Sequence, residues 1–122
     1  MQKWEVIRVY CDFLQRPHDK FCICICPVRR WFLFVNSDPP AFRKARGVAV
    51  SVEAFEAIFL RKQSFIDTTK FQVLEPHQLA PALADPDRNH GPISPMLRER
   101  LRGAVMLHDA LTDEQKAQIL ND

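Results

Sequence analysis

The stretch DKFCICICPVRRWFLFVNS, from Asp19 to Ser37, decides the expected fold of this chain. It has the pattern of two strands joined by a short basic turn. Side chains alternate between the two faces of a strand, and both faces of these strands are apolar. The first strand carries Phe21, Ile23 and Ile25 on one face and Cys22, Cys24 and Cys26 on the other. We therefore expect a hairpin with one face in a core and the other covered by a helix or a second subunit.

Further short strands are predicted on both sides of this hairpin. Residues 4–10 are rich in Val, Ile and aromatic side chains, which favours a first strand. A polar turn over 14–19 separates it from the hairpin, and a basic connection over 41–47 follows the hairpin. One helical turn is favoured within 53–60. The hairpin strands are expected at 20–26 and 31–36, and later strands at 48–52, 64–67 and 71–74. This spacing favours a small barrel.

After residue 75 the pattern changes to helices. Pro76 opens a short helix through Leu83, and residues 84–92 are dense in loop-forming residues. Ser94 followed by Pro95 predicts a helix start, because a hydroxyl cap precedes a proline at the first helical position. The sequence Thr-Asp-Glu-Gln at 112–115 is a capping box that opens a last helix. One face of the helix after Ser94 carries Leu97, Leu101, Ala104, Val105 and His108.

The order of these elements predicts an α+β fold that is mainly β. We expect one domain over residues 1–122, with strands from about 4 to 74 and helices from about 76 to 121. The chain is 47% hydrophobic and 26% charged, which is typical of a folded globular protein. It has no apolar run long enough to span a membrane, and charges interrupt its N-terminal region. We therefore expect a cytoplasmic protein with no membrane partner.

The cysteines and histidines are expected to have structural roles. Cysteines at every second strand position are poorly spaced for zinc or for a disulfide, so buried free thiols are expected. His108 is interpreted as a core histidine, and His77 and His90 are assigned no metal. Asp67 is expected to accept hydrogen bonds at a strand end. The chain has three glycines and no phosphate-binding loop signature, and no cofactor is expected.

Charge is unevenly distributed along the chain. Residues 1–74 contain 12 Lys and Arg against 7 Asp and Glu, a net charge of +5, whereas residues 75–122 contain 5 against 8, a net charge of −3. A positive potential over the strand-rich half would attract RNA or DNA. Ordinary solvated surface charge explains the same numbers equally well.

The order of the parts and several local strings resemble the PemK/MazF-like family of growth-inhibitor toxins. The matching pieces span nearly the whole chain. They are a first strand ending near Phe13, the turn Arg16-Pro17-His18-Asp19-Lys20, the strand FCICICP, a strand ending in Asn36-Ser37, the string SFIDT at 64–68, and the helix start over 91–96.

This resemblance implies a small SH3-like β-barrel followed by C-terminal helices, usually as a homodimer. It also implies a metal-independent endoribonuclease that cleaves single-stranded RNA and is often neutralised by a protein antitoxin. In that chemistry the ribose 2′-hydroxyl attacks the adjacent phosphate, giving a 2′,3′-cyclic phosphate and a 5′-hydroxyl end. The protein must supply an acid or base and cations that stabilise the developing charge.

Carried onto this sequence, the resemblance points to the two ends of the hairpin. The family's arginine corresponds either to Arg16, which keeps the Arg-Pro pair, or to Lys20, which has the right strand register. Ser37 matches the family's hydroxyl position, and Asn36 beside it could orient a phosphate. Histidine is the residue type whose unperturbed pKa lies closest to neutrality, so His18 is an acid/base candidate.

Three further residues are candidates for substrate binding: Asp19, in the same turn, and Arg29 and Arg30 beside Trp31, where a base could stack. Structural readings compete with these roles. The 18–20 segment could be a solvated turn, and Ser37 could simply initiate a turn. The alternative function is a non-catalytic barrel that binds a protein or nucleic acid through its hairpin face, after loss of the family's arginine site.

Overall fold

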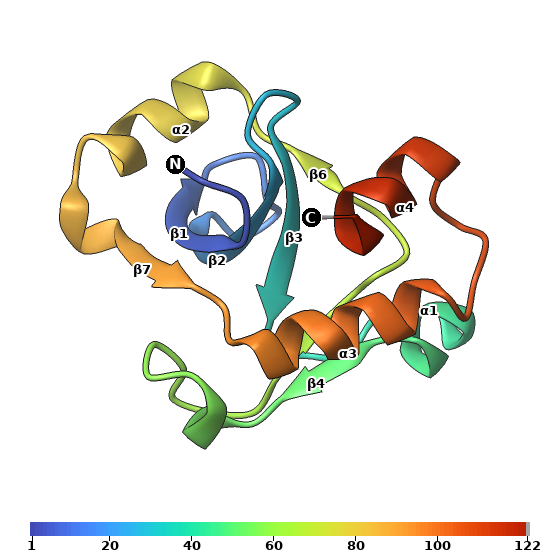
Figure 1. The fold of residues 1–122 in the computed structure, drawn as a ribbon. Helices are drawn as coiled ribbons and strands as arrows, with labels where there is room; N and C mark the ends of the chain where they lie inside the picture. Colours follow the sequence, from blue (N-terminus) through green and yellow to red (C-terminus); the bar gives the residue numbers. More distant parts are fainter. Residues whose placement is uncertain (122) are drawn as a thin grey trace.

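The predicted hairpin lies at the centre of a curled antiparallel sheet of seven strands (Figure 1). In this computed structural model, which describes residues 1–121, the hairpin strands are β2 (His18–Cys26) and β3 (Trp31–Asn36). Strand β1 (Glu5–Cys11) pairs with β2, and the sheet order is β4-β5-β3-β2-β1-β7, with β6 also paired to β3. The remaining strands are β4 (Val50–Val52), β5 (Ser64–Ile66), β6 (Gln72–Val73) and β7 (Asn89–Pro92).

The longer helices lie in the C-terminal part of the chain, which confirms the predicted α+β, mainly β class with C-terminal helices. The long helix of the C-terminal half is capped as the sequence indicates, because the Ser94 hydroxyl accepts a hydrogen bond from the Leu97 amide at 3.1 Å. The helices are α1 (Arg43–Gly47), α2 (Pro76–Leu83), α3 (Pro95–Val105) and α4 (Asp113–Leu120), with 3₁₀ turns η1 (Ala54–Glu56) and η2 (Pro86–Arg88). The final residue of the predicted domain, 122, lies outside the described residues.

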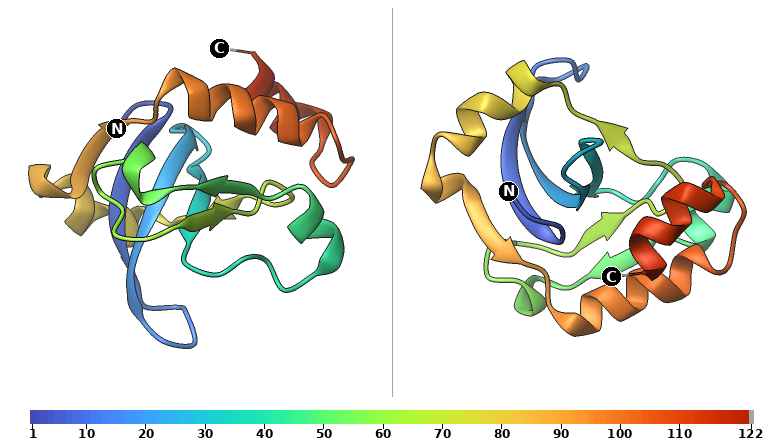
Figure 2. Two further views of the ribbon diagram at one scale, coloured as in Figure 1. Left: turned by 90° about the horizontal axis from the view of Figure 1, so that it is seen from below. Right: turned by 45° about the horizontal axis from the view of Figure 1, so that its top comes forward.

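Both faces of the hairpin are covered by this chain itself. On one face, Ile23 and Leu33 pack with Leu101 of α3 and Ile119 of α4, in what we call the helical core. On the other face, Cys22, Cys24 and Phe32 pack with Leu74 and with residues of α2, in what we call the α2 core. The α2 residues are Leu79 and Ala82. Figure 2 shows α2 on one side of the hairpin and α3 and α4 on the other. The cover expected from a helix or a second subunit is therefore provided by helices within the chain.

The segment 84–92 differs from its predicted loop. It contains η2 and then β7, which pairs antiparallel with the outer edge of β1 through Glu5↔Pro92 and Ile7↔Asn89. The four residues of β7, Asn-His-Gly-Pro, have no alternating pattern that would predict a strand. They become a strand because the edge of β1 presents unpaired backbone groups that need partners.

Three other local assignments also change. The first residues of β2, His18 and Asp19, were expected in the turn, but they pair with Cys11 and Tyr10 and so extend the hairpin. The basic connection contains the short helix α1. Helix α3 ends at Val105, so His108 follows the helix and does not lie on its apolar face.

All four cysteines are free and buried, as expected. Burial raises the pKa of the Cys24 thiol to about 12 and raises that of Cys22 well above its usual range. Hydrogen bonding with Cys22 lowers the pKa of Cys11. These thiols are part of the α2 core and contribute apolar surface there. Across residues 1–121, no helix has both the length and the apolar character needed to cross a membrane.

Candidate functional site

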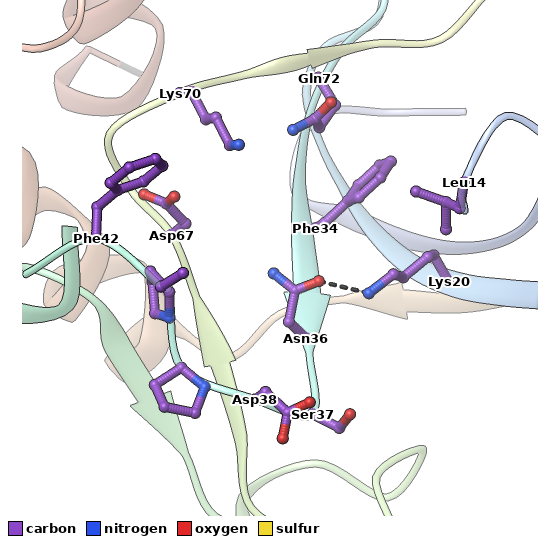
Figure 3. Close-up of a pocket in the computed structure, with 13 residues that line it drawn as sticks. Leu14, Lys20, Phe34, Asn36, Ser37, Asp38, Phe42, Asp67, Lys70 and Gln72 are labelled. Carbon is purple, nitrogen blue, oxygen red and sulfur yellow. Dashed lines mark hydrogen bonds between the residues drawn. The ribbon is translucent and has the colours of Figure 1, made fainter. Parts of the chain in front are cut away.

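Lys20 and Ser37 come together because a hairpin brings its two ends side by side. Phe21 of β2 pairs with Val35 of β3, so the residues just beyond this pair also face each other. The Lys20 ammonium donates a hydrogen bond to Asn36 Oδ1 at 2.5 Å (Figure 3). Lys20 and Asn36 are half-buried, and Ser37 is exposed at the end of β3. Three of the predicted site residues thus form one contiguous group.

Two cavities lie on either side of this group, and Lys20 and Ser37 line both of them. The first, which we call the basic cavity, has a volume of about 390 Å³ and is also lined by Arg8, His18, Asp19, Arg61, Lys62 and His90. The second, which we call the mixed cavity, has a volume of about 400 Å³ and is also lined by Phe34, Asn36, Phe42, Asp67, Lys70 and Gln72. Both volumes are in the range of small-ligand sites.

The basic cavity has a strong excess of positive charge. Asp19 is the one carboxylate among the described residues that line it. That carboxylate is already paired, since Arg88 Nη1 lies 3.1 Å from Asp19 Oδ1 and Arg8 Nε lies 3.7 Å from Asp19 Oδ2. The Lys20, Arg61 and Lys62 side chains add further positive charge, which favours an anionic ligand.

His90 also lines this cavity, although no sequence pattern placed it there. Its ring lies edge-on to Phe21, with 5.3 Å between ring centroids, and tilted against Phe59 at 5.6 Å. Burial lowers the pKa of His90, and the positive charge of Arg8 lowers it further. Both effects favour the neutral imidazole. The sequence around His90 contains no pattern that predicts this position, because only the pairing of β7 with β1 brings residue 90 to the cavity.

The ammonium of Lys20 is partly desolvated. Its pKa is lowered, chiefly because burial disfavours the charged ammonium. The hydrogen bond to Asn36 holds this ammonium between the two cavities. A partly desolvated cation in a fixed position stabilises developing negative charge more effectively than a solvated one.

The candidates from the 16–20 turn have different positions. Arg16 is exposed on the connection between β1 and β2 and is not among the residues lining either cavity. Its carbonyl oxygen accepts a hydrogen bond from His18 Nδ1 at 2.5 Å. His18 itself is exposed and lines the basic cavity. Of the two alternatives for the family's arginine, Lys20 is the one at the cavities.

Arg29 and Arg30 lie at the far end of the hairpin. They form the turn after Cys26, about 20 Å along the strand from Lys20 at roughly 3.3 Å per residue. Arg29 pairs with Glu114 of α4 and lies 5.0 Å from the Trp31 ring centroid. Arg30 donates from Nε to the Leu74 carbonyl at 3.0 Å. The structure does not bring these two predicted binding residues to the cavities.

Asp67 accepts hydrogen bonds at a strand end as expected, whereas His108, which was expected in the core, is half-buried beyond the end of α3. Asp67 Oδ1 accepts from the Thr69 amide at 2.9 Å and from the Thr69 hydroxyl at 2.6 Å. His108 Nε2 lies 3.2 Å from the hydroxyl of buried Thr68. Within residues 1–121, no three His, Cys, Asp or Glu side chains are arranged to hold a metal ion.

Comparisons with known proteins add no name to this site. No protein-family model, no curated protein and no solved structure matches the chain.

Proposed function

We propose that this chain is a toxin-like, metal-independent endoribonuclease that cleaves single-stranded RNA at the basic cavity. One observation carries the proposal: Lys20 and Ser37, which the PemK/MazF resemblance selects from opposite ends of the hairpin, line one strongly basic cavity together with His18 and His90. A phosphodiester is the anionic group that this combination of cations, hydroxyl and imidazoles suits best.

In this proposal the cations hold the phosphate and stabilise the charge that builds on it. Lys20, Arg8 and Arg61 line the cavity that receives the scissile phosphate. The Ser37 hydroxyl donates a hydrogen bond to a phosphate oxygen. These groups act on the pentacoordinate phosphorus, where negative charge on the non-bridging oxygens is greatest.

A histidine serves as the base. The His18 Nδ1–H donates to the Arg16 carbonyl, and this tautomer leaves a lone pair on Nε2. Nε2 takes the proton of the ribose 2′-hydroxyl as the 2′-oxygen bonds to phosphorus. The bond from phosphorus to the 5′-oxygen then breaks, that oxygen takes a proton from water, and His18 returns its proton to solvent. The products are a 2′,3′-cyclic phosphate and a 5′-hydroxyl.

The proposal includes the partners that the resemblance implies, a second copy of the chain and a protein antitoxin. Phe55 and Ile58 are 89% and 102% exposed, and the residues that follow them, 59–62, line the basic cavity. An acidic antitoxin that covered these apolar side chains would also close the basic cavity.

Cleavage of a single-stranded RNA oligonucleotide in the presence of EDTA tests the proposal. We expect cyclic-phosphate products from the RNA and none from the same oligonucleotide with 2′-deoxyriboses. Lys20→Ala should lower the cleavage rate by about 10²- to 10³-fold, as for loss of one transition-state donor. Lys44→Ala, at an exposed lysine of α1, is the control and should leave the rate unchanged.

RNA that stays intact at high protein concentration would contradict the proposed catalysis. The alternative is then a non-catalytic barrel that binds RNA in the same cavity, which is favoured by the position of Arg16 outside it. Binding of RNA with no cleavage, weakened by Lys20→Ala, would identify that alternative. Both faces of the hairpin are buried within the chain, so this alternative places RNA in the cavity and not on a hairpin face.

A further inference from the structure

We infer that the mixed cavity is a base-recognition site that selects guanine. This inference rests on the proposed function, since the base belongs to a nucleotide whose phosphate occupies the basic cavity. The two cavities share Lys20 and Ser37 as a common wall but differ in charge. The mixed cavity balances Lys20 and Lys70 against Asp38 and Asp67. A nucleotide has the same division, with an anionic phosphate attached to a neutral, planar base.

The mixed cavity offers an aromatic surface for such a base. Phe42 lies on the rim of this cavity and is 80% exposed, whereas most phenylalanine side chains are buried. Figure 3 shows Phe42 beside Asp67 on one wall and Phe34 on the facing wall, with the space between them open. Stacking on an exposed aromatic ring is a common way in which proteins hold single-stranded bases.

The orientation of the Asn36 amide is determined by Lys20. An ammonium group has donors only, so the atom of Asn36 that faces Lys20 Nζ at 2.5 Å must be the oxygen. The Asn36 Nδ2 group therefore points away from Lys20 and into the mixed cavity (Figure 3). It offers N–H donors there, as does Lys70 Nζ from the facing wall.

Asp67 supplies acceptors next to these donors. Its Oδ1 is held by the amide and hydroxyl of Thr69, which positions the half-buried carboxylate at the cavity wall. The carboxylate lies near Lys70 and across the open space from Asn36 (Figure 3). The cavity thus presents a carboxylate and the Lys70 ammonium on one wall, the Asn36 amide on the facing wall, and the Phe42 and Phe34 rings on either side of the open space.

Guanine is the base whose edge matches this arrangement. Its N1–H and N2–H₂ groups are adjacent donors that suit a carboxylate, and its O6 and N7 atoms are acceptors that suit Lys70 and Asn36. Adenine lacks the paired donors next to an acceptor, and cytosine has a single amino group beside ring acceptors. Uracil offers one N–H between two carbonyls. Guanine uses the carboxylate and both donor groups at once.

Titration of the ¹⁵N-labelled chain with 5′-GMP, 5′-AMP, 5′-CMP and 5′-UMP, followed by amide NMR shifts, tests the inference. We expect shifts in residues 34–42 and 67–72, and an affinity for GMP about ten-fold or more above that for the other three. Asp67→Asn keeps an acceptor for Thr69 but removes the carboxylate, and it should abolish the preference for GMP. Phe42→Ala should weaken binding of GMP, whereas Phe55→Ala, at an equally exposed phenylalanine outside the cavity, should not.

The outcomes separate this inference from the proposed function. Equal affinity for the four nucleotides, or no shifts in these two segments with GMP, overturns the inference, even if RNA is cleaved. GMP binding that depends on Asp67 and Phe42 supports it, even if RNA stays intact. Thermal unfolding of each variant shows that it is folded. Phe42 is exposed, so its variant tests the cavity independently of any destabilisation by Asp67→Asn.

Discussion

Burial changes the chemistry of individual side chains at the two cavities. The pKa values of Lys20 and His90 lie below those of the free side chains, chiefly because folding removes solvent from both groups. For both, the neutral form is favoured by the fold. These residues weaken the folded state when they are protonated, which is a cost commonly found at functional sites.

The lowered pKa of His90 predicts a pH dependence of stability. The unfolded chain takes up a proton on this residue near pH 6.5, before the folded chain does. The free energy of unfolding should therefore be greatest above about pH 6.5 and fall as the pH drops through the lower folded pKa.

Urea unfolding between pH 7.5 and pH 5 measures this effect. His90→Gln should flatten the part of the profile that lies below pH 6.5, because the titrating group facing Arg8 is removed. His77→Gln, at an exposed histidine of α2, serves as the control and should keep the slope. If the free energy of unfolding has the same pH dependence in the wild type and in His90→Gln, then His90 is not the group responsible for it.

Short polar signals determine where the helices begin. Ser94 and Thr112 each accept a hydrogen bond at 3.1 Å from an amide three residues later, as expected from their spacing before Leu97 and Gln115. Helix α3 begins at Pro95 and α4 at Asp113. The same local chemistry acts in the unfolded chain, so these helix starts are visible without tertiary information.

Removal of the α3 cap should destabilise the chain. Ser94→Ala loses the acceptor for the Leu97 amide, and the expected loss in free energy of unfolding is about 1 kcal/mol. Ser94→Thr retains a hydroxyl and should lose less. Chemical denaturation of the three proteins measures the difference. Equal stability of Ser94→Ala and the wild type would show that the cap hydrogen bond contributes nothing.

The hairpin joins two cores into one folding unit. Leu101 is 0% exposed in the helical core, and Leu79 is 3% exposed in the α2 core. The sheet between them contributes side chains to both, so neither core can lose its packing without exposing the hairpin. We expect the chain to unfold in one cooperative transition.

Leu101→Ala and Leu79→Ala test this coupling. Each should lower the free energy of unfolding by about 2–5 kcal/mol, because each creates a cavity in a packed interior. Both variants should still show a single transition when monitored by far-ultraviolet circular dichroism and by tryptophan fluorescence. If only one probe shifts in either variant, the two cores unfold separately.

The sequence predicted those parts of the fold that depend on local pattern. The alternation of Phe21 to Cys26 indicated a strand with two apolar faces, and both faces are buried. Strand β7 was missed, because Asn-His-Gly-Pro becomes a strand only when the edge of β1 pairs with it. His90 was missed with it, since its place beside Phe21 depends on that pairing.

For the candidate site, the family resemblance selected Lys20, Asn36 and Ser37 from the sequence, and these residues are neighbours because they lie at the paired ends of one hairpin. Only the tertiary structure separated Arg29 and Arg30 from that group, since a hairpin places its turn a full strand length from its ends. The tertiary structure also added Asp67, Lys70 and Phe42 on one side and Arg8 and His90 on the other. Alternation and capping act between residues close in sequence, whereas a cavity wall is built by segments that meet only when the sheet closes around both cores.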